Sequence, residues 1–302
     1  MVLYYTWALT EKLLSSIPFG RKVYETVGSV VNRNRKGKRA SFTSSFRLVR
    51  KGKEIIPPGG TVMDVGTGWF HHDAFLLWLV GDYTIYLFDV ADKAKLVYIK
   101  NYLQHLRDNI DLLLKELPLE KEITLAKIDS LLKLQSREEI YKVCKFIPCI
   151  TNKTDKPFLP ANSIDFMISN CVLTHIPPHI VVPELKALRE MLKPEGRMYF
   201  LIGHDDHWAF HDRSVNQFNY YRYSDKYYSS IFDTNFEYQN RMVKQEWLEL
   251  FANTGLVVDD YYGYITNSSR EQIAKLPHID KRFAQYPRED LAIIYSYFLL
   301  RK

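Results

Sequence analysis

The segment Thr61–Phe70, TVMDVGTGWF, constrains this chain most, because a short apolar run leads directly into Asp-x-Gly-x-Gly. The apolar run predicts a buried strand, and the glycines after it let the backbone bend sharply and come close to a ligand. We therefore expect Asp64, Gly66 and Gly68 to form a nucleotide-binding turn. A dinucleotide-binding turn would need a third glycine at position 71, where the chain has His71, so NAD is disfavoured.

Apolar strands alternate with helical stretches after this turn, as a parallel sheet requires. A strand at Val62–Val65, a helix at His72–Leu79 and a strand at Thr84–Asp89 form a predicted β-α-β unit. In such a unit, an acidic residue that ends the second strand takes the ribose hydroxyls, because a carboxylate can accept two O–H bonds. Asp89 stands at that position. Asp92 is a nearby competitor, for which capping a helix is the simpler role.

Later segments predict the remainder of a sheet and one insertion. The expected elements are a third strand at Val143–Cys149, a fourth from Asp165 to Asn170, a helix at Gln245–Asn253 and late strands at Leu256–Tyr262 and Asp290–Leu300. The charged, leucine-rich stretch Lys93–Lys142 predicts a helical insertion, which would cover a sheet edge or form an oligomer contact. Ligands of open α/β sheets bind beyond the carboxyl ends of the strands, so Asn170 belongs to the predicted site.

Four segments, in this order, resemble class I S-adenosylmethionine-dependent methyltransferases: VMDVGTGWF, LFD, SIDFMISNCVLTHI and LREMLKPEGRMYF. The resemblance covers about residues 55–205. It implies an α/β fold with a Rossmann-like, doubly wound, mostly parallel seven-stranded sheet and an antiparallel last strand. Residues 1–54 would form an N-terminal helical cap, and residues 55–302 the methyltransferase domain, with a helical insertion at about 100–142 and an aromatic lid at about 204–242.

The same resemblance implies S-adenosyl-L-methionine as cofactor and transfer of its methyl group to a nucleophile. Asp64, Gly66 and Gly68 would then hold the methionine end, and Asp89 the ribose. The full cofactor-binding set that the resemblance implies is Asp64, Gly66, Thr67, Gly68, Trp69, Asp89, Asp155, Asn170 and His175. Two positions depart from the family pattern: Phe70 replaces a frequent third glycine, and Thr174 replaces a frequent glutamate.

Three groups of histidines follow strands one, four and five, and should converge at the carboxyl edge of the sheet. An imidazole is a suitable general base for a hydroxyl or an amine that attacks the methyl group. His204 or His207 is the candidate base, although a hydrogen-bonded structural role is the alternative for each. The loop from His204 to Asp212 could also hold a metal, but we expect none, because carboxylates that neighbour histidines in a loop often cap helices instead.

The run Phe218–Tyr228, which continues to Arg241, is rich in tyrosine and arginine. Such side chains stack on rings and donate hydrogen bonds, so this run predicts an acceptor site. Its candidate substrate-binding residues are His211, Tyr220, Tyr221, Arg222 and Tyr223. Local core packing is an equal alternative, and stacking on nucleic-acid bases is a further one.

The N-terminal residues Leu3, Trp7, Leu9, Leu13, Leu14 and Ile17 recur at near-helical spacing. This spacing predicts a helix packed on the main domain, with an interfacial membrane helix as the alternative. No apolar run is long enough to cross a membrane. The net charge of +6 includes one basic cluster at 33–39, which would bind a phosphate or lie in a solvated loop. Three cysteines without metal spacing favour the cytoplasm.

We therefore expect S-adenosylmethionine-dependent methyl transfer to an oxygen or nitrogen of a small-molecule, carbohydrate or natural-product acceptor. An RNA methyltransferase acting on tRNA or rRNA, or a peptide methyltransferase, is the first alternative. A non-catalytic protein that binds S-adenosylmethionine is the second.

Overall fold

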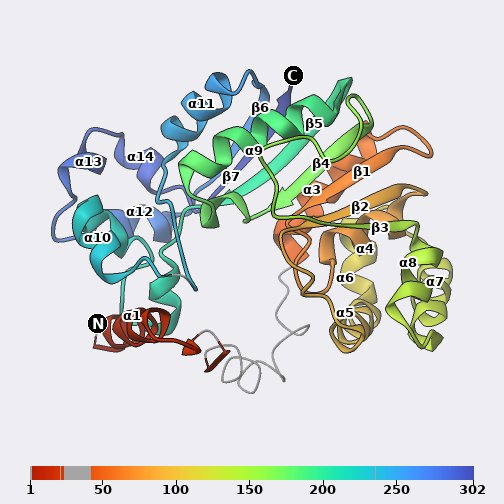
Figure 1. Ribbon diagram of the computed structural model, residues 1–302, viewed down its shortest axis with the longest axis horizontal. Coiled ribbons are helices and arrows are strands. Elements are labelled where there is room, and N and C mark those ends of the chain that lie inside the picture. The colour runs from red at the N-terminus through yellow and green to blue at the C-terminus, as the bar shows by residue number, and fades with distance from the viewer. Residues whose placement is uncertain (1, 21, 24–41, 235) are drawn as a thin grey trace.

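The computed structural model describes residues 2–20, 22–23, 42–234 and 236–302. Within these residues one sheet has the strand order β3-β2-β1-β4-β5-β7-β6 (Figure 1). Its strands are β1 (Thr61–Val65), β2 (Thr84–Asp89), β3 (Phe146–Ile150), β4 (Ile164–Asn170), β5 (Leu192–Gly203), β6 (Val257–Tyr264) and β7 (Tyr295–Arg301). Neighbours from β3 to β5 pair in parallel, and β7 is antiparallel to both β5 and β6. The predicted α/β fold, with a Rossmann-like, mostly parallel seven-stranded sheet and an antiparallel last strand, is confirmed.

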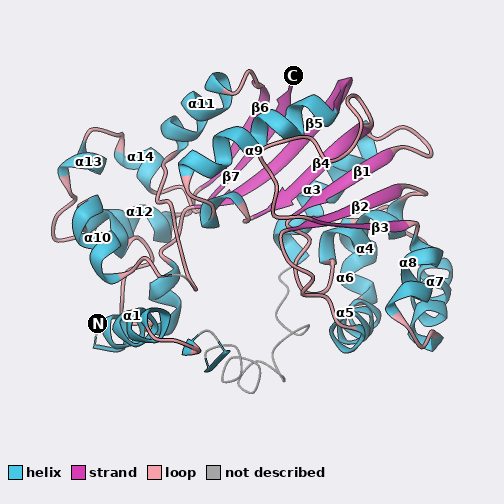
Figure 2. Cartoon of the chain, viewed as in Figure 1, coloured by secondary structure: helices cyan, strands magenta, loops and turns pink. Residues whose placement is uncertain are grey.

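Helices cover both faces of the sheet (Figure 2). Successive strand residues point to opposite faces, so the apolar side chains on both faces are buried by helices. On one face, Phe166 and Ile168 of β4 pack with α3 (Phe42–Ile55) and α4 (His72–Val80). On the other face, Met167 packs with α9 (Pro178–Met191) and α11 (Lys244–Asn253). Burial on both faces explains why the sequence of β4 is a nearly continuous apolar run.

The predicted insertion folds as helices at the β3 end of the sheet (Figure 1). These helices are α5 (Leu96–Asp108), α6 (Ile110–Glu116), α7 (Lys121–Lys133) and α8 (Arg137–Cys144). The capping box of Ser136 and Glu139 starts α8, and Lys145 ends it at φ 56°. As a result α8 occupies Val143 and Cys144, and β3 starts three residues later than the sequence predicts.

A third group of buried aromatic residues lies beside the sheet, around α1 (Val2–Ser16). Its other elements are the short helices η2 (His207–His211), η3 (Asn219–Arg222), α10 (Asp225–Ile231), α12 (Asn267–Ala274), α13 (Lys281–Ala284) and α14 (Arg288–Leu291). The helix α14 takes the place of the predicted start of the last strand, so β7 begins at Tyr295. No helix among the described residues is long and apolar enough to span a membrane.

The sequence predicts the helix α1 but not the face that it buries. The residues buried on α1 are Tyr4, Ala8 and Glu11. The predicted apolar residues Leu3, Trp7, Leu9, Leu13 and Ile17 are exposed instead. The Tyr4 hydroxyl donates a hydrogen bond to Asp206 Oδ2 at 2.7 Å, in a fully buried position. Docking therefore depends on this polar contact and on rings such as Phe232, whose centroid lies 5.0 Å from that of Tyr4.

We predict that Tyr4→Phe lowers the free energy of unfolding by about 1–3 kcal/mol, because it removes a partner from a buried carboxylate. The matched control on the same helix is Leu9→Ala, which should change stability by at most about 0.5 kcal/mol because Leu9 is exposed. Urea denaturation followed by circular dichroism measures both. A larger loss of unfolding free energy in Leu9→Ala than in Tyr4→Phe would contradict the burial of the Tyr4 face of α1.

Candidate functional site

The glycine turn after β1 is hydrogen-bonded to the end of β2. Gly66 and Gly68 have φ values of 78° and 69°, which side chains disfavour. The backbone N–H groups of Gly66 and Thr67 donate to the Phe88 carbonyl, at 2.8 and 3.0 Å. Gly68 N–H donates to Asp89 Oδ2 at 3.0 Å. The turn and the carboxylate predicted to bind a ribose therefore form one rigid unit.

The two glycines face different surroundings. A Cβ added to Gly66 would lie 2.4 Å from Cγ2 of Val172, in the loop after β4. A Cβ added to Gly68 would meet only the Gly66 carbonyl oxygen, at 3.8 Å. Gly66 is thus required for packing against the β4 loop. Gly68 leaves open space beside Asp89, where a ligand could approach the backbone.

We predict that Gly66→Ala destabilises the protein more than Gly68→Ala. Both variants place a side chain at positive φ, at a cost of about 1–2 kcal/mol. Only Gly66→Ala adds the clash with Val172, which should cost about 1–3 kcal/mol more. Thermal unfolding of the two variants measures the difference. Equal losses of stability in the two variants would show that the loop after β4 can move away from the turn without cost.

A buried polar network lies under the turn, between β1, α4 and β4. His72 Nε2 lies 2.9 Å from Asp73 Oδ2. The Asn170 amide donates to Asp73 Oδ2 and to Ser45 Oγ, each at 3.1 Å. Burial raises the pKa of the Asp64 carboxyl to about 7, and the neighbouring Asp73 adds to the shift. The site thus gathers two buried acids. Asp73 is paired with His72, and Asp64 suits a cationic ligand group such as an ammonium.

The other predicted cofactor residues occupy more varied positions. Thr67 Oγ1 lies 2.7 Å from His71 Nδ1 and is buried. Trp69 is 40% exposed beside the turn, and its ring lies edge-on to Tyr98 with centroids 5.9 Å apart. Asp155 is exposed in the loop after β3. Thr67 and Trp69 therefore belong to the turn, whereas Asp155 lies in a different loop.

His204, one of the two candidate bases, is held in the core. It is 2% exposed, its Nδ1–H donates to the Met242 carbonyl at 3.1 Å, and Nε2 accepts from Ser296 Oγ at 2.8 Å. Burial lowers the pKa of His204 to about 4. Both ring nitrogens are occupied by protein groups, so this geometry favours His207 as the base.

The His204 geometry predicts an acid-sensitive stability. Because the folded pKa of about 4 lies below the usual 6.5, the stability that neutral His204 contributes is full above about pH 6.5 and is lost as the pH falls toward 4. Between about pH 7.5 and 5 this loss should reach about 2 kcal/mol. His204→Gln should show a pH dependence smaller by that amount in urea denaturation. If the stability of His204→Gln and of the unmodified protein depended on pH in the same way, His204 would not be the buried neutral histidine described above.

His207 instead belongs to a cluster with His175 and Glu237. His207 Nδ1 lies 3.1 Å and His175 Nδ1 lies 3.5 Å from the same atom, Glu237 Oε1. The two imidazole centroids are 4.7 Å apart. Burial disfavours the charged form of His207, but the hydrogen bond to Glu237 raises its pKa. Burial and the neighbouring His207 lower the pKa of His175.

This cluster lines a cavity of about 290 Å³. Trp208, Phe210 and His211 form the remaining wall. The ring of His211 stacks on Trp7 of α1, with centroids 5.0 Å apart. The predicted residues His175, His207 and His211 are therefore brought together, at the carboxyl ends of β4 and β5.

Glu237 is the site residue that the sequence analysis missed. It lies inside the segment predicted as a lid, but nothing in its spacing from His175, 62 positions earlier, indicates contact. The link is tertiary: Asn240 N–H donates to the Thr174 carbonyl at 2.9 Å, and its side chain donates to the carbonyls of Leu173 and Ile176.

The tyrosine run contributes to the core more than to the cavity. Tyr220 and Tyr221 are buried, and the Tyr220 hydroxyl donates to the His204 carbonyl at 2.6 Å. Tyr223 is buried and its hydroxyl lies 2.8 Å from that of Tyr5. Arg222 donates to Asn219 Oδ1 at 2.9 Å. This arrangement matches core packing, the alternative that the sequence left open beside an acceptor site. The rings of Tyr220 and Tyr221 are buried, so they are not placed to touch an acceptor.

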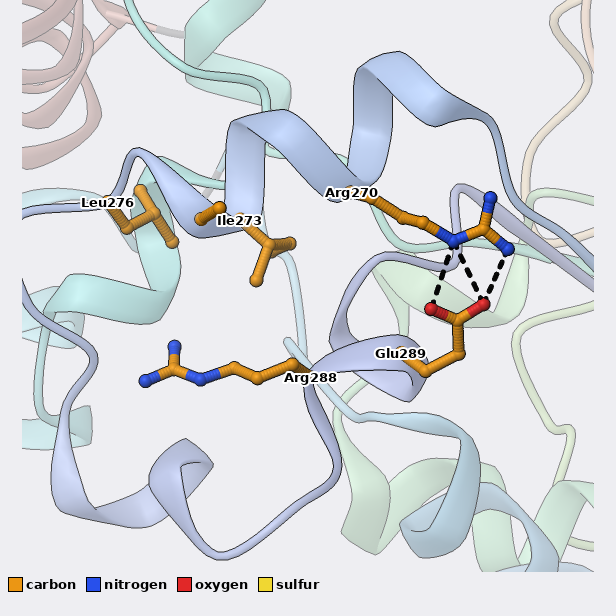
Figure 3. Close-up of a pocket in the computed structure, with 6 residues that line it drawn as sticks. Arg270, Ile273, Leu276, Arg288 and Glu289 are labelled. Carbon is orange, nitrogen blue, oxygen red and sulfur yellow. Dashed lines mark hydrogen bonds and ion pairs between the residues drawn. The ribbon is translucent and has the colours of Figure 1, made fainter.

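A second cavity, of about 340 Å³, lies at α12 and α14 (Figure 3). Arg270 and Glu289 form an ion pair along its wall, with Arg270 Nη2 2.6 Å from Glu289 Oε1. Predicted site residues are absent from its lining. The basic cluster at 33–39 lies outside the described residues, so the structure gives it no place at either cavity.

No family model and no curated protein matches this chain. Solved structures with a similar fold include a candidate methyltransferase of Haloferax volcanii in complex with the Trm112 activator, at 13% identity and TM-score 0.49, covering 91% of this chain and 96% of that one. A TehB-like SAM-dependent methyltransferase of Corynebacterium glutamicum has 11% identity and TM-score 0.46, covering 93% and 99%.

A third structure is geranyl diphosphate C-methyltransferase of Streptomyces coelicolor with Mg²⁺, geranyl diphosphate and S-adenosyl-L-homocysteine. It has 11% identity and TM-score 0.45, and the match covers 85% of this chain and 77% of that one. The assignment of the fold rests on the strand order and on the antiparallel β7.

Proposed function

We propose that this protein binds S-adenosyl-L-methionine and transfers its methyl group to an oxygen or nitrogen atom of a small-molecule or carbohydrate-like acceptor. The observation that supports this most is the pairing of Gly68 N–H with Asp89 Oδ2, beside the open space that Gly68 leaves. It lies at the carboxyl edge of a methyltransferase-type sheet, where such folds bind nucleotides.

The residues around the turn fit this cofactor. Gly68 N–H holds one oxygen of Asp89 and Ala91 N–H holds the other, so the carboxylate is fixed in place. Lys93 Nζ lies 3.6 Å from Oδ1, and Oδ2 keeps a lone pair for a ribose hydroxyl. Asp64 would attract the ammonium of the methionine end, while Asp73 is paired with His72. Trp69 offers an exposed ring beside the turn. When bound, the cofactor supplies an electrophilic methyl group on a sulfonium.

The acceptor would occupy the cavity of His175, His207 and His211. Methyl transfer needs the acceptor atom in line with the bond from sulfur to the methyl group, so the protein would accelerate the reaction mainly by positioning the acceptor. His207 is oriented by Glu237 and is the candidate base for an acceptor that must lose a proton. The helix α1, whose Trp7 stacks on His211, and the short helix η2 would lie around the acceptor.

We predict that Asp89→Asn weakens S-adenosylmethionine binding by roughly 10–100-fold, because the neutral amide loses charge-assisted bonds worth about 1.5–3 kcal/mol. Asp92→Asn is the matched control, because Asp92 is exposed three residues later and pairs with Arg137. Calorimetric titration of both variants with S-adenosylmethionine, and separately with NAD, measures the effect.

Unchanged affinity in Asp89→Asn would overturn the ribose assignment. Binding of NAD in place of S-adenosylmethionine by the unmodified protein would overturn the proposed function. Binding of S-adenosylmethionine alone would justify a screen of phenols and glycans as methyl acceptors, with S-adenosylhomocysteine formation as the readout.

A further inference from the structure

We propose that His175, His207 and Glu237 form a binding site for one divalent transition-metal ion, of which Zn²⁺ is the best match. Candidate ligand atoms of the three side chains all lie within 4.8 Å of one another. The inference does not rest on the proposed function, because it concerns metal binding in the absence of any cofactor.

The spacing of the cluster is close to that of a bound metal. Zn²⁺ binds imidazole nitrogen and carboxylate oxygen at about 2.0–2.2 Å in a tetrahedron, which places neighbouring ligand atoms about 3.4 Å apart. The two measured separations from Glu237 Oε1 to the Nδ1 atoms are 3.1 and 3.5 Å. A cation could replace the proton between His207 and Glu237 with only small side-chain movements. His175 Nδ1 also lies 3.2 Å from the Tyr238 carbonyl oxygen, so His175 would exchange that hydrogen bond for the metal or bind it through Nε2.

The type of ligand selects the cation. Two neutral imidazoles and one carboxylate suit Zn²⁺ and its first-row neighbours, whereas Mg²⁺ and Ca²⁺ prefer sites built from oxygen. A cation would also offset the negative charge of Glu237, whose side chain is only 29% exposed. We therefore expect Mg²⁺ not to compete at this site.

The three ligands come from three segments that the protein ties together. His175 lies in η1 (Leu173–His175) after β4, and His207 starts η2 after β5. Gln239 accepts from the His207 backbone N–H at 3.3 Å and donates to the Asp205 carbonyl at 2.6 Å. Asn240 holds η1 through the carbonyls of Leu173 and Thr174. Such supporting bonds orient the ligands before the ion arrives.

The cluster leaves room for a further ligand. His175 is 44% exposed and the cluster opens on the cavity that His211 also lines. Three protein ligands with an open position are typical of zinc sites that bind water or substrate, whereas structural zinc sites are closed by four protein ligands. The cation would thus face the space that we assign to the acceptor, and while His207 binds the cation it would not also serve as the base.

The test is calorimetric titration of the full-length protein with Zn²⁺ after chelator treatment and dialysis. Replacement by Co²⁺, followed by its visible absorption, reports the coordination independently. We expect one Zn²⁺ per chain, four- or five-coordinate Co²⁺, and no competition from Mg²⁺.

The variants Glu237→Gln and His207→Gln remove ligands, so each should weaken binding by more than the roughly 10–100-fold that loss of an orienting partner typically costs. Gln239→Ala removes such a partner and should fall within that range. His179→Gln is the matched control, since His179 is exposed on α9 outside the cluster. Circular dichroism verifies that each variant folds.

Stoichiometric Zn²⁺ binding that both ligand variants lose and His179→Gln keeps would establish the site. Absence of stoichiometric binding, or equal affinity in Glu237→Gln and the unmodified protein, would overturn it. Titration with S-adenosylmethionine is measured separately, so failure of the metal site and failure of the proposed function are distinguished.

Discussion

The parallel pairing of β2, β1, β4 and β5 is the constraint on which the candidate site depends. Because these strands run in one direction, their carboxyl ends lie at one edge of the sheet, and the loops that follow them meet there. The register sets Val65 beside both Phe88 and Ser169. The turn after β1 thereby reaches the end of β2 and packs on the loop after β4.

The loops at this edge are fixed by hydrogen bonds rather than by their own secondary structure. Phe88 and Asp89 accept the N–H groups of the glycine turn. Asn240 fixes the loop that carries His175 in the same way, because it donates hydrogen bonds to three carbonyls of the loop after β4. Buried polar groups of this kind are costly when unpaired, so each contact positions its neighbours.

The aromatic layer around α1 supports the histidine side of the same edge. Tyr4 bonds to Asp206, which also caps η2 by accepting from Trp208 N–H at 3.0 Å. The buried Arg241 donates to the carbonyls of Tyr220 and Tyr223 and lies 4.1 Å above the ring of Tyr228. The tyrosine run therefore holds the loop of His207 in position.

The sequence alone determined the strands, the glycine turn and the position of Asp89, because their signals are local: apolar runs, glycine spacing and the distance from turn to acid. It did not determine the start of β3, because the last turn of α8 occupies Val143 and Cys144. Only the tertiary structure placed His204 in the core, turned Tyr4 rather than Leu9 inward and brought Glu237 to His175. These outcomes depend on contacts between residues far apart in the chain, which leave no periodic or spacing signal in the sequence.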